Sequence, residues 1–116
     1  MNQPLRVGVI GAGRWCKTAH LPGFHRSPLC ELVAISDLHI DLAEARASEF
    51  DIPSVTTNYR ELLERDDIDV IDVVTRGDHQ DLVFEALEAG KHCLVEKPVC
   101  HDYRDVWKAQ ALADAK

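Results

Sequence analysis

A glycine-rich turn near the N-terminus is the part of this 116-residue sequence whose chemistry is easiest to read. Residues 5–10 form a short apolar run, and Gly11-Ala12-Gly13 follows it directly, ahead of a stretch with helical spacing. Gly11 permits a tight turn, and the missing side chain at Gly13 lets a pyrophosphate approach the backbone. Free N–H groups and the dipole at a helix start attract such an anion. The turn therefore predicts a dinucleotide site; the alternative is a tight turn that binds nothing.

Two further positions belong to the same pattern. Cys16 stands where the dinucleotide fingerprint has its third glycine, a position that needs a small residue for helix–sheet packing. Asp37 ends a second apolar run at about the expected spacing of ~20 residues, where an acid accepts hydrogen bonds from both ribose hydroxyls of adenosine. It would repel a 2′-phosphate, and Leu38 adds no positive charge, so NAD is favoured over NADP. Arg14 keeps NADP open, because an arginine near the ribose can hold that phosphate. Asp37 could instead be a helix cap or a solvent-facing acid.

The composition excludes several classes of protein. Thirteen Lys and Arg against twenty Asp and Glu give a net charge of -7, and without a basic cluster this argues against nucleic acid as a partner. No apolar run approaches the ~20 residues of a membrane span, and the N-terminus lacks a secretory pattern, so we expect a cytoplasmic protein. The cysteines show neither C-x-x-C nor zinc spacing, so we expect reduced thiols and no metal site. They are Cys16, Cys30, Cys93 and Cys100.

Strands and helices are expected to alternate along the whole chain. Apolar runs predict strands at residues 5–10, 32–36, around 55, 70–74 and 92–95. Helical spacing predicts helices at about 14–25, 41–50, after a cap at Asn58, from 82 to a stop at Gly90, and at 102–115. Pro22 is expected to bend the first helix or end it early.

This alternation predicts an α/β protein with a doubly wound parallel sheet, a Rossmann fold with strand order 3-2-1-4-5. The length suits one domain, a nucleotide-binding domain over residues 1–116. In such sheets ligands bind beyond the carboxyl ends of the strands, where the strand order reverses. Here that point lies between the first and fourth strands.

With the strands placed, the chain from Leu5 onward resembles the N-terminal domain of the Gfo/Idh/MocA family, which includes glucose–fructose oxidoreductase and inositol dehydrogenase. The resemblance is carried by Gly11-Ala12-Gly13-Arg14-Trp15, Asp37, Val73-Val74-Thr75, Ala89-Gly90-Lys91-His92 and, most specifically, Glu96-Lys97-Pro98. In that family the fourth strand usually ends T-P-x-x-x-H. Here the segment reads Thr75-Arg76-Gly77-Asp78-His79, without the proline and one residue shorter.

The resemblance implies roles for single residues. Lys97 would lie near the reacting carbon and hold or polarise the substrate oxygen, where a cation stabilises a developing alkoxide; otherwise it is an exposed lysine before a turn proline. Glu96 would contact the nicotinamide ribose, and Thr75 and His79 would line the nicotinamide side of the cleft, although His79 could be a helix-start residue facing water. Trp15 would roof the cleft or pack against the last helix. The other histidines follow no ligand spacing and are interpreted as structural or surface residues: His20, His25, His39, His92 and His101.

The family implies an NAD(P)-dependent oxidoreductase that transfers hydride between the nicotinamide and a hydroxyl-bearing carbon of a sugar or polyol. Its enzymes carry a second α/β domain for the substrate, and these 116 residues contain no counterpart, so turnover by this chain alone stays open. The fifth strand would lie at a sheet edge, through which two copies could pair. The alternative function is a non-catalytic NAD-binding module that senses NAD or docks onto another chain. A homoserine- or dipicolinate-type reductase is a third interpretation, against which Glu96-Lys97-Pro98 counts.

Overall fold

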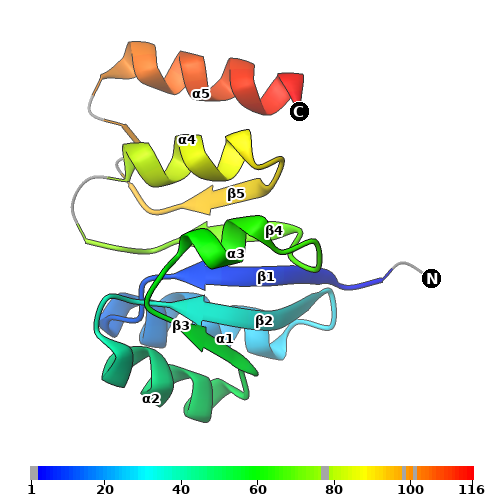
Figure 1. Ribbon diagram of the computed structural model, residues 1–116, viewed down its shortest axis with the longest axis vertical. Helices are drawn as coiled ribbons and strands as arrows, with labels where there is room; N and C mark the ends of the chain where they lie inside the picture. Colours follow the sequence, from blue (N-terminus) through cyan, green and yellow to red (C-terminus); the bar gives the residue numbers. More distant parts are fainter. Residues whose placement is uncertain (1–2, 77–78, 98, 101) are drawn as a thin grey trace.

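The computed structural model of this chain describes residues 3–76, 79–97, 99–100 and 102–116 (Figure 1). Its strands form one parallel sheet in the order β3-β2-β1-β4-β5, which confirms the predicted order. The strands are β1 (Leu5–Ile10), β2 (Cys30–Ser36), β3 (Ser54–Thr56), β4 (Val70–Val73) and β5 (His92–Val95). The order reverses between β1 and β4, and β5 lies at one edge of the sheet.

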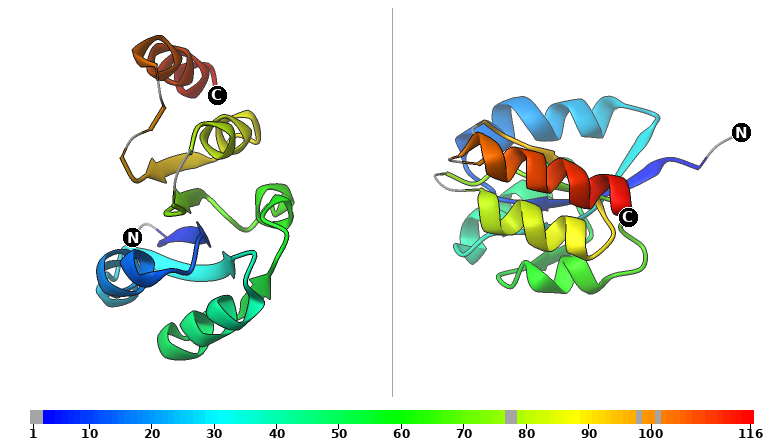
Figure 2. Two further views of the ribbon diagram at one scale, coloured as in Figure 1. Left: turned by 90° about the vertical axis from the view of Figure 1, so that its left-hand side faces the viewer. Right: turned by 90° about the horizontal axis from the view of Figure 1, so that it is seen from above.

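Helices cover both sides of the sheet, as the two views of Figure 2 show. On one side, η1 (Cys16–His20), α1 (Leu21–Arg26) and α2 (Ile40–Phe50) enclose a core that includes Val9, Leu21 and Ile35. On the other side, α3 (Arg60–Glu64) and α4 (Gln80–Glu88) pack around Leu62 and Ile71. The last helix, α5 (Tyr103–Ala115), packs outside α4. Burial of apolar side chains on both faces explains why the central strands are almost continuously apolar.

The first helix runs through Pro22, so the expected early end is wrong. Helical residues 14–15 lead into η1, a π-helical turn, and α1 then continues to Arg26. The N–H of Leu21 donates to the carbonyl of Cys16, five residues earlier, which is the π-helical pattern. A proline ring clashes with the carbonyl four residues before it, and the wider turn directly ahead of Pro22 relieves that contact. The continuous helix carries His20 to the sheet.

Side chains cap the starts of two helices, α3 and α5, with hydrogen bonds to backbone N–H groups. The side chain of Asn58 accepts a hydrogen bond from the N–H of Arg60 at 3.1 Å, at the start of α3. Asp102 accepts from the N–H of Arg104 at 2.8 Å and begins α5. These contacts hold the short connections in place. None of the four cysteines is part of a disulfide, in agreement with the expected reduced state.

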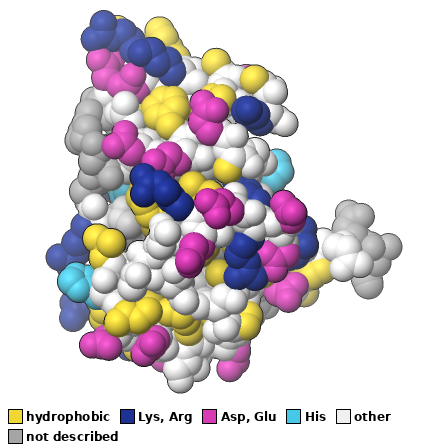
Figure 3. Space-filling model, in the orientation of Figure 1, with side chains coloured by type: hydrophobic (Ala, Val, Ile, Leu, Met, Phe, Trp, Pro, Cys, Tyr) yellow, Lys and Arg dark blue, Asp and Glu magenta, His cyan; other side chains and the backbone are white. Residues whose placement is uncertain are grey.

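The molecular surface carries charges of both signs. On the face shown in Figure 3, acidic and basic side chains are interspersed, and basic side chains with a histidine stand at the left-hand edge, where the strands end in Figure 1. In the part of the chain that the structure describes, no helix has both the length and the apolar character needed to cross a membrane.

Candidate functional site

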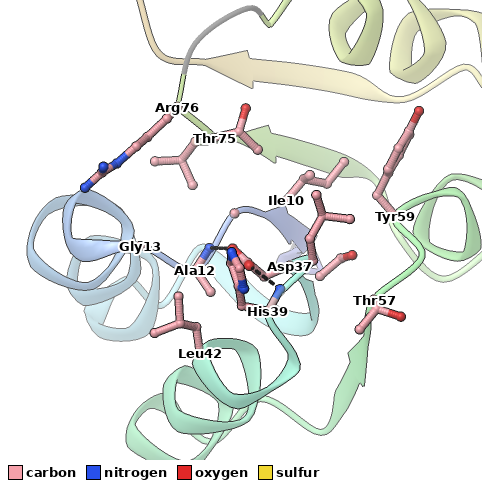
Figure 4. Close-up of a pocket in the computed structure, with 14 residues that line it drawn as sticks. Ile10, Ala12, Gly13, Asp37, His39, Leu42, Thr57, Tyr59, Thr75 and Arg76 are labelled. Atoms are coloured by element: carbon pink, nitrogen blue, oxygen red, sulfur yellow. Dashed lines mark hydrogen bonds between the residues drawn. The ribbon is translucent and has the colours of Figure 1, made fainter.

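A hollow of about 590 Å³ lies at the carboxyl ends of β1, β2 and β4 (Figure 4). Its walls come from the end of β1 with the glycine turn, the end of β2, the start of α2 and the segment after β4. Hydrogen bonds tie these strand ends together: the N–H of Gly11 donates to Ser36 at 2.8 Å, and that of Val74 to Ile10 at 2.9 Å. The hollow therefore occupies the predicted point where the strand order reverses.

The two glycines of the turn have different surroundings. Gly11 has φ +114°, and a Cβ there would lie 2.9 Å from the carbonyl carbon and oxygen of Val74. Only glycine fits this conformation and this close backbone approach. At Gly13 a Cβ would meet no atom within 4 Å, so the space beside the helix start is open. Gly11 makes the turn, and Gly13 leaves the room that a phosphate group needs.

Asp37 joins the end of β2 to the glycine turn. Its Oδ2 accepts from the N–H of Ala12 at 2.8 Å, and its Oδ1 accepts from the N–H of His39 at 2.7 Å (Figure 4). These bonds hold a half-buried carboxylate in a defined orientation against the hollow. Each carboxylate oxygen can accept a second hydrogen bond, so a sugar hydroxyl can still bind here. Asp37 is thus a local cap, and its role toward a ribose stays a prediction.

The hollow contains a polar atom that needs a partner. Thr75 Oγ1 is buried, lines the hollow, and has no hydrogen-bond partner in the described part of the chain. A buried hydroxyl left unpaired costs about 1–3 kcal/mol, so this atom points to a ligand as its partner. Arg76 also lines the hollow, and its side chain extends from the β4 side toward the glycine turn (Figure 4). Gly77 and Asp78, which complete this loop, lie outside the described residues.

His79 is buried at the start of α4, with 3% of its surface exposed, so the alternative of a water-facing residue is wrong. Its Nε2 donates to the carbonyl of Thr75 at 2.6 Å. This bond draws the helix start back onto the end of β4. Whether His79 touches a cofactor stays a prediction.

The end of β5 is tied to the first helix instead of to the hollow. Trp15 is exposed, does not line the hollow, and donates from Nε1 to Glu96 Oε1 at 2.8 Å. Trp15 therefore does not line this hollow, and whether it touches a bound cofactor stays a prediction. Glu96 also borders a second, shallower depression of about 520 Å³ beside η1 and α1. Lys97 and Arg14 are both exposed and line neither space, and Pro98 lies outside the described residues.

The structure thus brings together only some of the predicted site residues. Gly11, Gly13, Asp37 and Thr75 share the main hollow. The hollow also contains residues that the sequence analysis did not assign to it, from the start of α2, the β3–α3 connection and the segment after β4: Leu38, His39, Leu42, Thr57, Tyr59 and Arg76. No spacing in the sequence could have identified them, because they come from separate connections.

A group of three titratable side chains, His20, Asp72 and Glu96, was also missed. His20 Nδ1 lies 2.8 and 2.9 Å from the two carboxylate oxygens of Asp72, and His20 Nε2 lies 2.6 Å from Glu96 Oε1. Asp72 is fully buried in β4. The signal for this group was an acid within an otherwise apolar strand that is covered on both faces, since such an acid needs a partner.

The pKa values of the three groups are coupled. Burial raises the pKa of Asp72 to about 6, although the charge of His20 opposes this. Burial alone would lower the pKa of His20, but hydrogen bonds and charges from Glu96 and Asp72 outweigh it and raise that pKa. The hydrogen bonds from His20 and Trp15 lower the pKa of Glu96. Histidine and glutamate therefore favour their charged forms in this group.

Comparisons with known proteins identify relatives of the same architecture. A family model described as an oxidoreductase family with an NAD-binding Rossmann fold matches residues 5–116. A curated relative, the dTDP-3,4-didehydro-2,6-dideoxy-alpha-D-glucose 3-reductase of Actinomadura kijaniata, is 39% identical over 111 residues, which are 95% of this chain and 33% of that protein.

Solved structures agree with this match. A 3-ketoreductase from Actinomadura kijaniata, in complex with TDP-benzene and NADP, superposes with a TM-score of 0.91 at 36% identity, over 97% of this chain and 36% of that one. A myo-inositol 2-dehydrogenase from Lactobacillus plantarum gives a TM-score of 0.85 at 26% identity, over 97% of this chain and 34% of that one. The chain spans 33–36% of the length of these three relatives.

Proposed function

The chain belongs to the Gfo/Idh/MocA oxidoreductase family, and from this premise we propose that its main hollow binds NAD for hydride transfer at a hydroxyl-bearing carbon of a sugar or polyol. We assign residues 1–116 to one nucleotide-binding domain, and the substrate pocket to further residues such as the longer relatives carry. The single observation that carries the proposal is the open space at Gly13, beside a helix start and at the reversal of strand order. A backbone that leaves this room fits a diphosphate.

Polar groups around the hollow fit the remaining parts of a dinucleotide. Asp37 suits the adenosine ribose, and Thr75 Oγ1 has hydrogen-bonding capacity to spare. Arg76 would add positive charge beside the phosphates, where a guanidinium forms strong hydrogen bonds. Arg14 and His39 would lie near the adenosine end, and His79 and Glu96 toward the nicotinamide end.

We favour NAD over NADP because Asp37 is held by two backbone amides and cannot turn away from a 2′-phosphate without breaking them. The neighbouring Leu38 is exposed and carries no compensating charge. The similar Actinomadura 3-ketoreductase was solved with NADP, so the choice of dinucleotide needs its own experiment.

Calorimetric titration of the Asp37→Ser variant tests this preference. Loss of a charged hydrogen-bond acceptor should weaken NAD binding by about 10- to 100-fold. The affinity for NADP should stay unchanged or increase, because the charge that repels the 2′-phosphate is gone. Glu44→Gln, which removes a negative charge at an exposed position of α2 outside the hollow, should leave both affinities within about two-fold. Equal losses for NAD and NADP in D37S would contradict the assigned preference.

The bound nicotinamide ring supplies the hydride donor or acceptor of the reaction. Lys97 follows Glu96 at the end of β5, where its ammonium can hold the substrate oxygen and stabilise negative charge on it. Glu96 uses Oε1 for Trp15 and His20, which leaves Oε2 for a hydroxyl of the nicotinamide ribose. The family resemblance and these free groups support both roles.

The proposal is tested by titrating the purified chain with NAD and by following absorbance at 340 nm with NAD and myo-inositol. We expect a saturable binding heat with NAD. Binding without turnover, also with a sugar nucleotide as substrate, would favour the non-catalytic module for this chain. The absence of binding to both NAD and NADP would overturn the proposed function.

A further inference from the structure

The group formed by His20, Asp72 and Glu96, in which Asp72 is fully buried, joins three separate elements. His20 comes from η1, on the helix that begins at the glycine turn; Asp72 comes from β4; and Glu96 follows β5. The imidazole lies between the two carboxylates, at 2.8 Å from Asp72 Oδ2 and 2.6 Å from Glu96 Oε1. One ring therefore connects the centre of the sheet to the end of its edge strand.

The proton count of this group is defined by its two contacts. A carboxylate accepts but cannot donate, so each His20–carboxylate contact needs one proton between its partners. Two contacts need two protons among three groups, which leaves one net negative charge. If one of these protons is lost, one contact becomes a repulsion between an imidazole lone pair and a carboxylate. Both hydrogen bonds of His20 therefore exist only while the three groups share these two protons.

We propose that His20 is a positioning residue that holds Glu96, and with it the end of β5, against the first helix, so that the nicotinamide half of the dinucleotide meets a preformed surface. This inference rests on the proposed function. Asp72 is an immobile anchor because it is fully buried in β4. Glu96 has no such anchor of its own, since its side chain is 29% exposed and follows the strand.

The surroundings of Glu96 show how the positioning works. Its N–H donates to the carbonyl of Val73 at 3.1 Å, which fixes the backbone but leaves the side chain free to rotate. His20 and Trp15 both donate to Oε1, so the carboxylate plane is held and Oε2 is presented outward. Without His20, Glu96 would keep contacts to the exposed indole of Trp15 and to the backbone N–H of exposed Lys97. A carboxylate that has lost its link to a buried anchor loses orientation.

The charged and titratable neighbours do not replace His20. Cys16 lies on η1 and Cys93 on β5, and burial raises the pKa of both thiols, to about 12 and about 11. These thiols are neutral near pH 7 and offer no countercharge to Asp72. Within the described residues, His20 is the group that balances the two carboxylates.

The proposal is tested by comparing ligands that share the adenosine diphosphate but differ beyond it. ADP lacks the nicotinamide ribose, ADP-ribose has the ribose without the ring, and NAD has both. Calorimetry of the His20→Phe chain should show NAD and ADP-ribose binding weakened about ten-fold or more, as expected for loss of a charged hydrogen bond, and ADP binding within about two-fold of the unmodified chain.

A double variant guards against simple misfolding, because His20→Phe leaves the buried Asp72 without its partner. His20→Gln with Asp72→Asn rebuilds both contacts from neutral amides: the amide of residue 72 donates to that of residue 20, which donates to Glu96. This variant should recover NAD affinity to within about three-fold and lose the pH dependence, since no histidine remains in the group. His25→Gln changes an exposed histidine of the same helix and serves as the matched control.

The pH profile gives a second readout that a purely structural role would not separate. NAD affinity of the unmodified chain should fall as pH rises through the raised pKa of His20, whereas ADP affinity should change little. Equal losses for NAD and ADP in the His20 variant, or unchanged NAD affinity, would overturn the positioning role while leaving the proposed function intact. Failure of the unmodified chain to bind any of the three ligands would overturn both.

Discussion

At the scale of single residues, the two glycines of the turn have different roles, one in folding and one in the proposed binding of a dinucleotide. Gly11 has a backbone conformation and a contact with the end of β4 that no side chain tolerates, whereas Gly13 faces open space. The two glycines look alike in the sequence, but Gly11 is needed for the turn, whereas Gly13 leaves the space in which we propose that a ligand phosphate binds. Substitution of each by alanine should therefore fail in a different way.

Gly11→Ala should lower the free energy of unfolding by about 2–4 kcal/mol, from backbone strain together with the clash at Val74. Gly13→Ala should leave it within about 0.5 kcal/mol, because the added methyl group meets no atom. The same Gly13 variant should bind NAD at least about ten-fold more weakly, since the methyl group occupies space intended for phosphate. Urea unfolding and calorimetry measure the two effects. A Gly13 variant that binds NAD normally would contradict this division.

Cys16 shows how a departure from the fingerprint is accommodated. This position needs a small residue for helix–sheet packing, and Cys16 is fully buried in the core between the first helix and the sheet. The π-helical turn begins at this residue. Burial, with the nearby charge of Asp72, raises the pKa of its thiol to about 12, so it packs as an apolar group.

At the scale of elements, two helix ends use the left-handed conformation with different residues. α4 is followed by Gly90 at φ +79°, which matches the predicted stop. α2 ends at Phe50, and Asp51, the residue that follows, has φ +57°. An aspartate tolerates this conformation better than most residues but less well than glycine.

Asp51→Gly should raise the free energy of unfolding by about 0.5–1 kcal/mol, because it removes the cost of a left-handed aspartate. Gly90→Ala should lower it by about 1 kcal/mol for the opposite reason, and the empty space around Gly90 excludes a steric contribution. Both changes can be measured by urea unfolding with the unmodified chain as reference. If the two variants shifted stability in the same direction, the conformational explanation would be wrong.

At the scale of the whole molecule, the group of His20, Asp72 and Glu96 couples stability to pH. Because folding raises the pKa of His20, its contribution is complete below the ordinary histidine value near 6.5 and is lost as pH rises through the folded value. Asp72 acts in the same sense at lower pH, since burial raises its pKa to about 6 and charging it costs stability.

The free energy of unfolding should therefore fall as pH rises from 6 to 8, below the range in which thiols of the unfolded chain ionise, by no more than about 1.4 kcal/mol per pH unit for the one proton involved. Urea unfolding across this range measures the slope. The double variant with Gln at position 20 and Asn at position 72 should show a smaller slope. Identical slopes for both chains would show that the group does not control stability in this range.

Much of the fold and part of the site follow from the sequence because they depend on neighbours along the chain. The order of strands, the capping by Asn58 and the turn at Gly11 are set by residue type and local spacing. Asp37 was found by its distance from the glycine turn. The unassigned lining residues of the hollow carry no such spacing, because separate connections bring them together.

The sequence alone determined the alternation of strands and helices, the reversal point between β1 and β4 and the glycine turn, since hydrophobic periodicity and backbone freedom act over a few residues. Only the tertiary structure decided that His20 connects Asp72 to Glu96, which are 52 and 76 positions away from it along the chain. These side chains meet only after β4 and β5 pair and the first helix packs on the sheet. Burial then makes each of them depend on the protons and charges of the other two.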